Sequence, residues 1–257
     1  MSLIIQKLSV QYGLKNALEV GPLTFEKGKV IALLGPNGSG KSTLISAMTS
    51  YHELTSGRVT LLGAEADKKP FKVARDGVTR VFQIPHLFER VSVLDNVLTG
   101  MYRRDKYSIF DAIFRTPRYL KANSRSVAEA KALLSLAGML GMEELAAGSI
   151  SHGQKRLLEV IRAVATEPKI LILDEPATGL TQDEMHSLTS LIRTLAAGGM
   201  CVVLIEHNVA FLMDLADIVT VIQSGKVIAE GTPQEVQKNE RVLEAYLGNT
   251  DFSKELA

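Results

Sequence analysis

Reactive and charged side chains are grouped at a few places along this chain of 257 residues. The first group is the glycine-rich run Gly35-Pro36-Asn37-Gly38-Ser39-Gly40-Lys41-Ser42, which has the form G-x-x-x-x-G-K-S. Its glycines allow backbone N–H groups to approach an anion closely. Lys41 adds a point charge for β- and γ-phosphates, and Ser42 offers Mg²⁺ a hydroxyl where a helix begins. The spacing predicts a phosphate-binding loop formed by Gly35, Asn37, Gly38, Ser39, Gly40, Lys41, Ser42 and Thr43.

A second group consists of two carboxylates placed directly after an apolar strand. The run Ile170-Leu171-Ile172-Leu173 leads into Asp174 and Glu175. Ligands of open α/β sheets bind at the carboxyl ends of the strands. We therefore expect Asp174 to hold Mg²⁺, directly or through water. We expect Glu175 to orient or deprotonate a water molecule, a role typically worth about 10²–10⁴-fold in rate.

Three polar or aromatic residues stand at the ends of other predicted strands, and each has two interpretations. The amide of Gln83 either meets solvent or, if its strand lies beside the phosphate loop, reaches the metal or the attacking water. His207 is either structural or contacts a γ-phosphate, a task for which a neutral imidazole is suited. Tyr12 either packs at the edge of a sheet or stacks on a base.

The start of a later helix is a candidate for a second anion site. Ser151 and Gln154 form an S-x-x-Q capping box. Gly153 lies within the first turn, where glycine costs stability, and this indicates that something approaches the backbone closely. A helix N-terminus that carries serine and glycine suits an anion.

The elements that must position these residues follow from the pattern of apolar residues. Val30 to Leu34 is apolar throughout, as expected of a parallel strand buried on both faces. Further strands are predicted at residues 3–10, 18–25, 57–62, 79–83, 170–173, 201–205 and 218–222. Helices are predicted at residues 42–50, 92–100, 155–166 and 181–197.

The bulk properties of the chain exclude several classes of protein. There are 29 Lys and Arg residues against 28 Asp and Glu residues, so the total charge does not favour a nucleic-acid binder. The one cysteine, Cys201, permits no internal disulfide and fits a reducing compartment. No apolar run approaches the roughly 18 residues needed to span a bilayer, and the N-terminus lacks the features of a signal peptide. We expect a cytoplasmic protein that meets a membrane only through a partner.

The segment from Met101 to Lys131 differs from the rest of the chain in composition. Basic residues outnumber acidic ones there, and aromatic residues are interspersed: Tyr102, Tyr107, Phe110, Phe114 and Tyr119. The segment is either a solvated helical insertion with a few core aromatics or a docking surface, because basic and aromatic residues are common interface anchors. Contact with a membrane surface or with nucleic acid is a third interpretation.

Taken together, the motifs resemble those of the ABC-type ATPases, in the same order and over nearly the whole chain. Gly35 to Ser42 matches the Walker A motif, and Gln83 matches the Q-loop. Ile150 to Gln154 matches the signature segment, except that His152 stands where glycine is usual.

The other motifs of that family follow. Ile170 to Glu175 matches Walker B with the catalytic glutamate, and His207 matches the switch histidine. Tyr12 matches the aromatic residue that stacks on adenine. Thr181 departs from the pattern, because aspartate is usual there and commonly crosses the dimer interface.

The resemblance implies an α/β fold with a P-loop NTPase (RecA-like) core at residues 1–84 and 149–248. An N-terminal antiparallel β-subdomain belongs to this core, a helical subdomain is inserted at residues 85–148, and residues 249–257 form a tail. The implied cofactors are ATP and Mg²⁺. Catalysis would rest on Lys41, Glu175 and His207, and the metal would lie near Ser42, Gln83 and Asp174.

The resemblance also implies partners. A head-to-tail dimer with an identical or paralogous ATPase subunit would bind ATP in trans through Ser151, Gly153 and Gln154. Two transmembrane permease subunits would dock on the dimer at the cytoplasmic face of the cell membrane. A periplasmic or extracellular substrate-binding protein would take part indirectly, and nucleic acid is not expected as a partner.

Within the family, two features resemble those of the ATPase subunits of importers for branched-chain or other hydrophobic amino acids. They are the insertion from Met101 to Arg125 and the ending Glu244 to Gly248. The segment Ser151 to Lys155 also resembles the urea/amide-importer branch. Two alternatives come from other classes: a soluble ABC ATPase that acts on nucleic acid or ribosomes, and a nucleotide-binding regulator that does not hydrolyse. The first usually carries two such domains or a coiled coil, and the intact carboxylate pair argues against the second.

Overall fold

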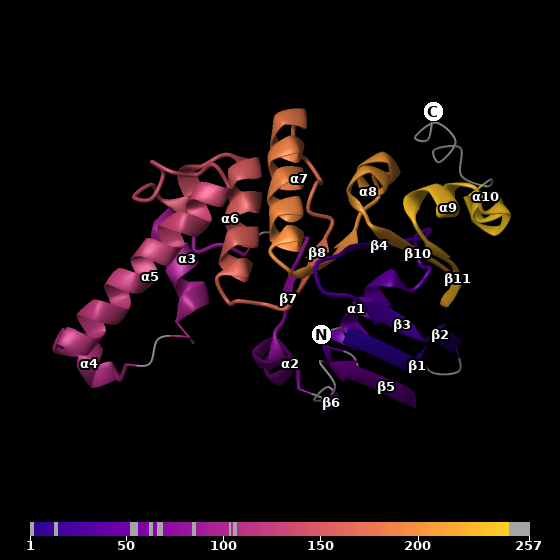
Figure 1. The fold of residues 1–257 in the computed structure, drawn as a ribbon, viewed down its shortest axis with the longest axis horizontal. Coiled ribbons are helices and arrows are strands. Elements are labelled where there is room, and N and C mark those ends of the chain that lie inside the picture. The colour runs from indigo at the N-terminus through magenta and orange to yellow at the C-terminus, as the bar shows by residue number, and fades with distance from the viewer. Residues whose placement is uncertain are drawn as a thin grey trace. The chain divides into compact units, whose positions relative to one another are not determined.

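The computed structural model describes residues 3–12, 15–51, 56–61, 64–65, 69–83, 86–102, 104 and 107–246. The chain divides into two compact units. The first comprises Met1–Arg80, Lys169–Pro176 and Ile192–Ala257, and the second comprises Val81–Pro168 and Ala177–Leu191. The first unit contains the sheets, and the second is mainly helical (Figure 1).

A six-stranded sheet forms the centre of the first unit, with the strand order β11-β10-β4-β9-β8-β7. The neighbours β10 and β4, β4 and β9, and β9 and β8 are parallel. Their residues are almost all apolar and buried, as expected of parallel strands covered on both faces. The bounds are β4 Val30–Leu34, β7 Val78–Val81, β8 Ile170–Asp174, β9 Cys201–Ile205, β10 Ile218–Gln223 and β11 Lys226–Gly231. This order brings the carboxyl ends of β4, β9 and β8 side by side.

An antiparallel sheet of the first unit is built around β1, Leu3–Tyr12. β2 (Lys15–Val20), β3 (Leu23–Phe25) and β5 (Ser56–Leu61) pair with β1, and β6 (Ala64–Glu65) pairs with β5. The prediction of one strand over residues 18–25 was wrong, because the chain breaks at Gly21-Pro22. Pro22 has no N–H with which to continue a ladder, and Gly21 has a φ of 139°.

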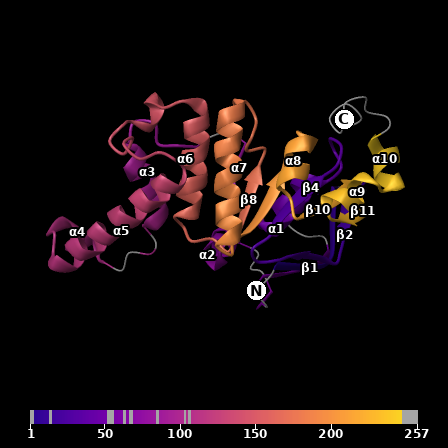
Figure 2. The same cartoon turned by 45° about the horizontal axis from the view of Figure 1, so that its top comes forward.

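Helices complete the first unit. They are α1 Lys41–Met48, α2 Pro70–Asp76, α8 Val209–Leu215, α9 Pro233–Gln237, α10 Glu240–Tyr246 and the last turns of α7, Gln182–Ala197. The apolar side of α1 joins one hydrophobic core with residues of both sheets. α9 and α10 pack against β11 (Figure 2). Residues 247–257, which include the end of the run from Glu244 to Gly248 and the predicted tail, lie outside the described residues.

The second unit is built on three packed helices. α3 (Val93–Met101) contacts both α5 (Pro117–Leu136) and α6 (His152–Val164). A Cβ atom on Gly100 would lie 2.4 Å from the carbonyl oxygen of Arg162, so glycine permits the close approach of α3 to α6. The short α4 (Ile109–Ile113), a 3-10 turn at Ala147–Ser149 and the first turns of α7 complete this unit. No helix in the described part of the chain is long and apolar enough to cross a membrane.

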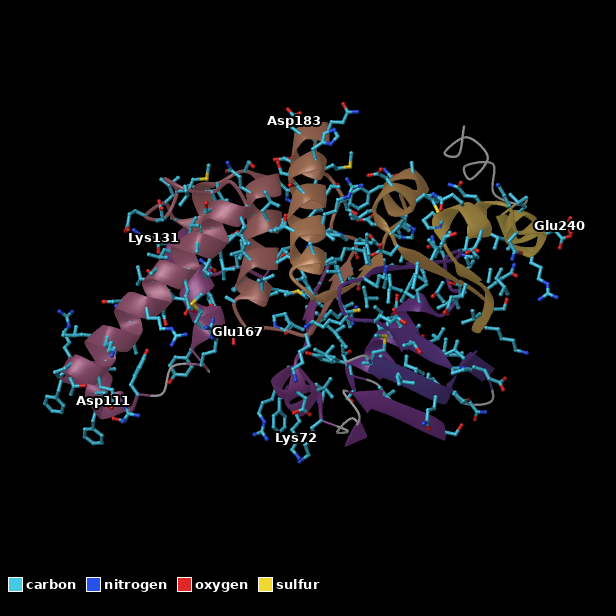
Figure 3. All side chains as sticks on the ribbon, in the orientation of Figure 1. Lys72, Asp111, Lys131, Glu167, Asp183 and Glu240 are labelled. Carbon is cyan, nitrogen blue, oxygen red and sulfur yellow. The ribbon has the colours of Figure 1, made fainter. Side chains whose placement is uncertain are left out.

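The basic and aromatic segment includes α4, where Figure 3 labels Asp111, and most of α5. Asp111 accepts hydrogen bonds from the backbone and hydroxyl of Ser108, and these close a capping box. Phe110, Ile113 and Phe114 are 73%, 67% and 72% exposed. Phe110 and Phe114 are therefore not core aromatics. Tyr107 and Tyr119, in contrast, are partly buried and pack edge to face with their ring centroids 5.1 Å apart.

Candidate active site

Glycine shapes the loop between β4 and α1. Gly38 and Gly40 have φ values of 75° and 111°, which glycine adopts without strain. A Cβ atom on Gly40 would lie 3.1 Å from Cδ1 of Leu18 and 3.2 Å from the carbonyl oxygen of Ala17. Gly40 is also the N-cap of α1 and supplies no side-chain cap. The first N–H groups of α1 are therefore left to an external acceptor, as an anion site at a helix N-terminus requires.

Lys41 is the first residue of α1 and is buried, with 7% of its surface exposed. Its Nζ donates to the carbonyl oxygens of Gly35 at 2.5 Å and Pro36 at 3.1 Å. Burial lowers the pKa of the ammonium group, and the negative charges of Glu175 and Asp174 oppose this shift. A phosphate group would give the ammonium a charged partner in place of neutral carbonyls, and such hydrogen bonds are shorter and stronger.

Glu175 lies where the chain turns sharply after β8. Its φ is 48°, in the left-handed region that non-glycine residues seldom occupy outside special sites. Its N–H donates to the carbonyl oxygen of Ile205 at 2.9 Å, which joins the ends of β8 and β9. Its Oε1 lies 2.8 Å from Nε2 of His207, and the two side chains are 17% and 55% exposed. The contact with the imidazole thus fixes the orientation of the carboxylate. A carboxylate that orients a water molecule needs such a fixed orientation.

Asp174, the last residue of β8, forms an ion pair with Arg80 of β7. Nη2 of Arg80 donates to Oδ2 of Asp174 at 2.5 Å, and both side chains are largely buried. Sequence reasoning missed Arg80. A charged residue near the end of a predicted strand is ordinarily solvated, so neither its type nor its spacing marked it.

One cavity of roughly 550 Å³ brings these groups together. It is lined by Ala17, Asn37, Gly38, Ser39, Gly40, Lys41, Ser42, Thr43, Asp174, Glu175, Ile205, His207 and Ser224. The predicted loop, both carboxylates and His207 therefore face the same space. Sequence reasoning also missed Ala17 and Ser224; the latter precedes Gly225, whose N–H donates to the carbonyl of Ser39 at 2.7 Å. The side chain of Tyr12 lies outside the described residues.

The predicted second anion site lies in the second unit, at the start of α6. Its capping box is confirmed: the N–H of Gln154 donates to Oγ of Ser151 at 3.1 Å, and the N–H of Ser151 donates to Oε1 of Gln154 at 2.9 Å. Glu184 of α7 also reaches this helix start. It accepts from Oγ of Ser151 at 3.1 Å and from the backbone N–H of Gly153. A Cβ atom on Gly153 would lie 2.0 Å from Cδ of Glu184, so only glycine permits this approach.

Glu184 is held in place by its own helix as well. The N–H and hydroxyl of Thr181 donate to its Oε2 at 3.0 Å and 3.1 Å. The backbone hydrogen bond from Thr181 is the largest cause that lowers the pKa of Glu184. Desolvation comes next and opposes it, and weaker contributions from Ser151, the Thr181 hydroxyl and Gly153 lower the pKa further. An ionised carboxylate at the start of α6 is what the helix dipole favours.

Gln83 also belongs to the second unit, where its backbone is anchored to α6. The guanidinium of Arg156 donates to the carbonyl oxygens of Phe82 at 2.8 Å and Gln83 at 3.0 Å. Arg156 and Glu159 are 2% and 4% exposed and form a buried ion pair. The N–H of His86 donates to the same Glu159 at 2.6 Å. The role of the Gln83 amide near the metal stays a prediction.

Comparison with known families shows to which family the chain belongs. A family model described as ABC transporter matches residues 19–178. The chain belongs to the ABC transporter family. A second model, described as branched-chain amino acid ATP-binding cassette transporter, matches residues 226–251 of this ABC transporter chain.

Relatives of this ABC transporter chain match it over nearly its full length. The high-affinity branched-chain amino acid transport ATP-binding protein BraF of Pseudomonas aeruginosa is 34% identical, over 95% of this chain and 96% of BraF. LivG of Escherichia coli K12, also a high-affinity branched-chain amino acid transport ATP-binding protein by name, is 32% identical over 96% of this chain and 97% of LivG.

Solved structures of the family support the fold. An ATP-binding cassette of an ABC transporter in its ADP conformation has a TM-score of 0.82 and 30% identity, over 97% of this chain and 100% of that one. A nucleotide-free ATP-binding cassette has a TM-score of 0.80 and 29% identity, over 96% and 99% of the two chains. The predicted P-loop NTPase fold is thereby confirmed.

The residues of this ABC ATPase fit the Mg²⁺ ion that the sequence led us to expect. The hydroxyl of Ser42 and the carboxylate of Asp174 are oxygen donors that line the same cavity, and Mg²⁺ prefers oxygen ligands. In the part of the chain that the structure describes, no group of three or more His, Cys, Asp or Glu residues could hold a metal ion. Mg²⁺ is usually bound by one or two carboxylates together with waters and substrate phosphates.

Proposed function

We propose that this chain hydrolyses ATP and thereby powers an ABC importer for branched-chain or other hydrophobic amino acids. The cavity in which Lys41, Asp174, Glu175 and His207 meet supports the catalytic part of the proposal. The near full-length match to BraF and LivG supports the cargo, because both relatives are named for branched-chain amino acid transport.

The loop and α1 would bind the phosphates of ATP. The free N–H groups at the start of α1 would donate to phosphate oxygens, and Lys41 would exchange its carbonyl partners for the β- and γ-phosphates. Ser42 and Asp174 would hold Mg²⁺, which supplies charge neutralisation of the phosphate oxygens when it is bound.

Glu175 would act on the water that attacks the γ-phosphorus. Its carboxylate would orient the water and accept its proton. The new bond from oxygen to the γ-phosphorus forms as the bond to the β,γ-bridging oxygen breaks, which gives ADP and phosphate. His207 would keep the carboxylate in place through the 2.8 Å contact and reach the γ-phosphate with its exposed ring.

A second copy of the chain, or a paralogue, would supply the other half of the ATP site. Ser151, Gly153 and Gln154 would contact the ATP of the partner, so that the N-termini of α1 and α6 clamp the γ-phosphate between them. Hydrolysis would remove this bridge and release the dimer. Light scattering with Glu175→Gln tests the idea: we expect a dimer with ATP and a monomer with ADP. No ATP-dependent association, alone or with a paralogous subunit, would contradict it.

The membrane parts of the importer would come from other chains. Two permease subunits would carry the amino acid, and a substrate-binding protein outside the membrane would deliver it. This subunit would lie on the cytoplasmic face, and its dimerisation would drive the permeases between their states.

Phosphate release by the purified full-length chain tests the catalytic proposal. We expect the wild type and the control Glu240→Gln, which alters an exposed glutamate of α10, to release phosphate from ATP. Glu175→Gln should still bind ATP in calorimetry but release phosphate at least about 100-fold more slowly. If the wild type binds ATP and releases no phosphate, the chain is a nucleotide-binding regulator instead.

Uptake by cells that lack the gene tests the cargo. We expect the uptake of labelled leucine to fall while the uptake of labelled urea is unchanged. A loss of urea uptake alone would place the chain in the urea/amide branch. If neither changes and the protein binds DNA or RNA with a steep salt dependence, the nucleic-acid alternative holds.

A further inference from the structure

Arg80 places a permanent positive charge against the carboxylate that is expected to hold the metal. It lies on β7, the strand next to β8 in the sheet, and Asp174 ends β8. Nη2 of Arg80 lies 2.5 Å from Oδ2 of Asp174, and the two side chains are 13% and 14% exposed. Because an arginine does not lose its proton in a protein, this charge is present at every working pH.

The surroundings of Asp174 explain why such a charge matters. Glu175 follows it directly, both carboxylates line the cavity, and both act electrostatically on Lys41. Two adjacent carboxylates attract divalent cations even without a nucleotide, since hard cations bind to carboxylate oxygens. A guanidinium beside one of them offsets part of that attraction, because like charges repel more strongly in a poorly solvated site.

We propose that Arg80 is a positioning residue for Asp174, which orients its carboxylate and keeps divalent cations out until nucleotide phosphates accompany them. The proposal rests on the proposed function, since it assigns Asp174 to the metal side of an ATP site. With ATP present, the phosphate oxygens add the negative charge that outweighs Arg80. The metal then enters together with the nucleotide and not ahead of it.

A purely structural role makes a different prediction. The ion pair joins β7, the last strand in the order of the sheet, to β8. If that is its only purpose, loss of Arg80 lowers the stability of the protein and leaves cation binding unchanged. Cation binding without nucleotide is therefore the decisive property.

The experiment measures the binding of Mn²⁺, a paramagnetic substitute for Mg²⁺, to the full-length protein by electron paramagnetic resonance. We expect Arg80→Gln to bind Mn²⁺ without nucleotide at least about tenfold more tightly than the wild type, which corresponds to ~1.4 kcal/mol. Arg80→Lys, which keeps the charge, should stay within about threefold of the wild type. Arg193→Gln is the matched control, because Arg193 forms an exposed ion pair with Asp214 in the same unit.

Adding Asp174→Asn to Arg80→Gln should remove the gain, since the proposal places the extra binding at Asp174. A folded Arg80→Gln variant with the Mn²⁺ affinity of the wild type would overturn the proposal. If Arg80→Gln does not fold, the wild type decides: Mn²⁺ binding without nucleotide that equals its binding with ADP would also overturn it. These outcomes are separate from the ATPase proposal, because phosphate release by the wild type tests that one alone.

Discussion

Nε2 of His207 lies 2.8 Å from Oε1 of Glu175, although the two residues are 32 positions apart in the chain. The sheet explains the contact. β8 and β9 are parallel neighbours, and Asp174 pairs in register with Ile205. The residues that follow the two strands therefore lie at the same carboxyl edge of the sheet. We infer that the imidazole and the carboxylate work as one unit.

Once Glu175 has been removed, removal of His207 should have almost no further effect on the rate of ATP hydrolysis. We expect Glu175→Gln to lower kcat for ATP hydrolysis by about 10²–10⁴-fold. We expect His207→Ala to lower kcat as well, because the Glu175 carboxylate then loses the contact that fixes its orientation. The double variant should be no slower than the slower single variant, since groups that act together are not additive. Steady-state phosphate release checks this, with His186→Ala on α7 as the control. Effects that multiply would show that the two residues act independently.

Lys41 should give the nucleotide-free protein a distinctive dependence of stability on pH. Burial lowers its pKa in the native state, so the unfolded chain holds the proton more tightly. Between the lowered native value and the ordinary value of 10.5, the free energy of unfolding rises with pH because of this residue. Below that window, the buried charge costs stability.

Lys41→Met removes the charge and keeps the apolar length of the side chain. The variant should therefore be more stable than the wild type below the window, and the difference should shrink as pH rises through it. Urea unfolding without nucleotide at several pH values between about 7 and 10 measures this. Lys226→Met, on the exposed surface, is the control. A difference that does not vary with pH would show that the environment of Lys41 does not disfavour its charge.

Gly153→Ala should leave the stability of the protein nearly unchanged and impair its ATP-dependent functions. Alanine in a helix interior is favoured over glycine by up to about 1 kcal/mol, and the gain is smaller in the first turn, where Gly153 is the second residue of α6. Its Cβ, however, would lie 2.0 Å from Cδ of Glu184, so the carboxylate must leave the start of α6. We expect a thermal unfolding temperature close to that of the wild type and a clear loss of ATP-dependent dimerisation and phosphate release.

A second substitution tests the cause. Adding Glu184→Ala to Gly153→Ala removes the clash with the carboxylate. Dimerisation and phosphate release should then recover to the extent that the displaced Glu184 caused their loss. If Gly153→Ala alone has the activity and dimerisation of the wild type, the close approach to Gly153 has no functional meaning.

Arg156→Met should destabilise the protein strongly, because it leaves Glu159 charged and buried and leaves the carbonyls of Phe82 and Gln83 without their donor. Loss of one partner of a buried pair typically costs about 3–5 kcal/mol. Arg156→Met combined with Glu159→Leu should lose less. Urea unfolding compares them with Arg193→Met, whose exposed pair should change stability by only about 0–1 kcal/mol. Equal losses in the single and double variants would contradict this.

The positions of the phosphate loop, the two carboxylates and His207 could be predicted from the sequence because they follow from simple rules. β4, β8 and β9 are apolar runs, and residues that follow parallel strands meet at one edge. Lys41, Asp174, Glu175 and His207 therefore converge as expected, and they line one cavity. The capping box at Ser151 was equally visible in the chain.

Other features depend on contacts that no local pattern encodes. Arg80 meets Asp174 across 94 positions, and a single arginine in a strand gives no sign of its partner. Glu184 was readable as the last member of a T-x-x-E capping box begun by Thr181, but its approach to Gly153 depends on how α7 packs beside α6. The break at Pro22 was missed because the apolar residues on both sides suggested one strand. The exposure of Phe110 and Phe114 depends on the packing of α4 against α5, which composition does not reveal.

The most direct test asks whether amino acid uptake depends on ATP hydrolysis in this cavity. Cells that lack this gene are supplied with the wild-type chain or with Glu175→Gln, and the initial rate of labelled leucine uptake is measured at equal protein levels. We predict that the wild type restores uptake and that Glu175→Gln does not, although it still binds ATP. Full uptake with Glu175→Gln would contradict the claim that hydrolysis at this site powers the importer.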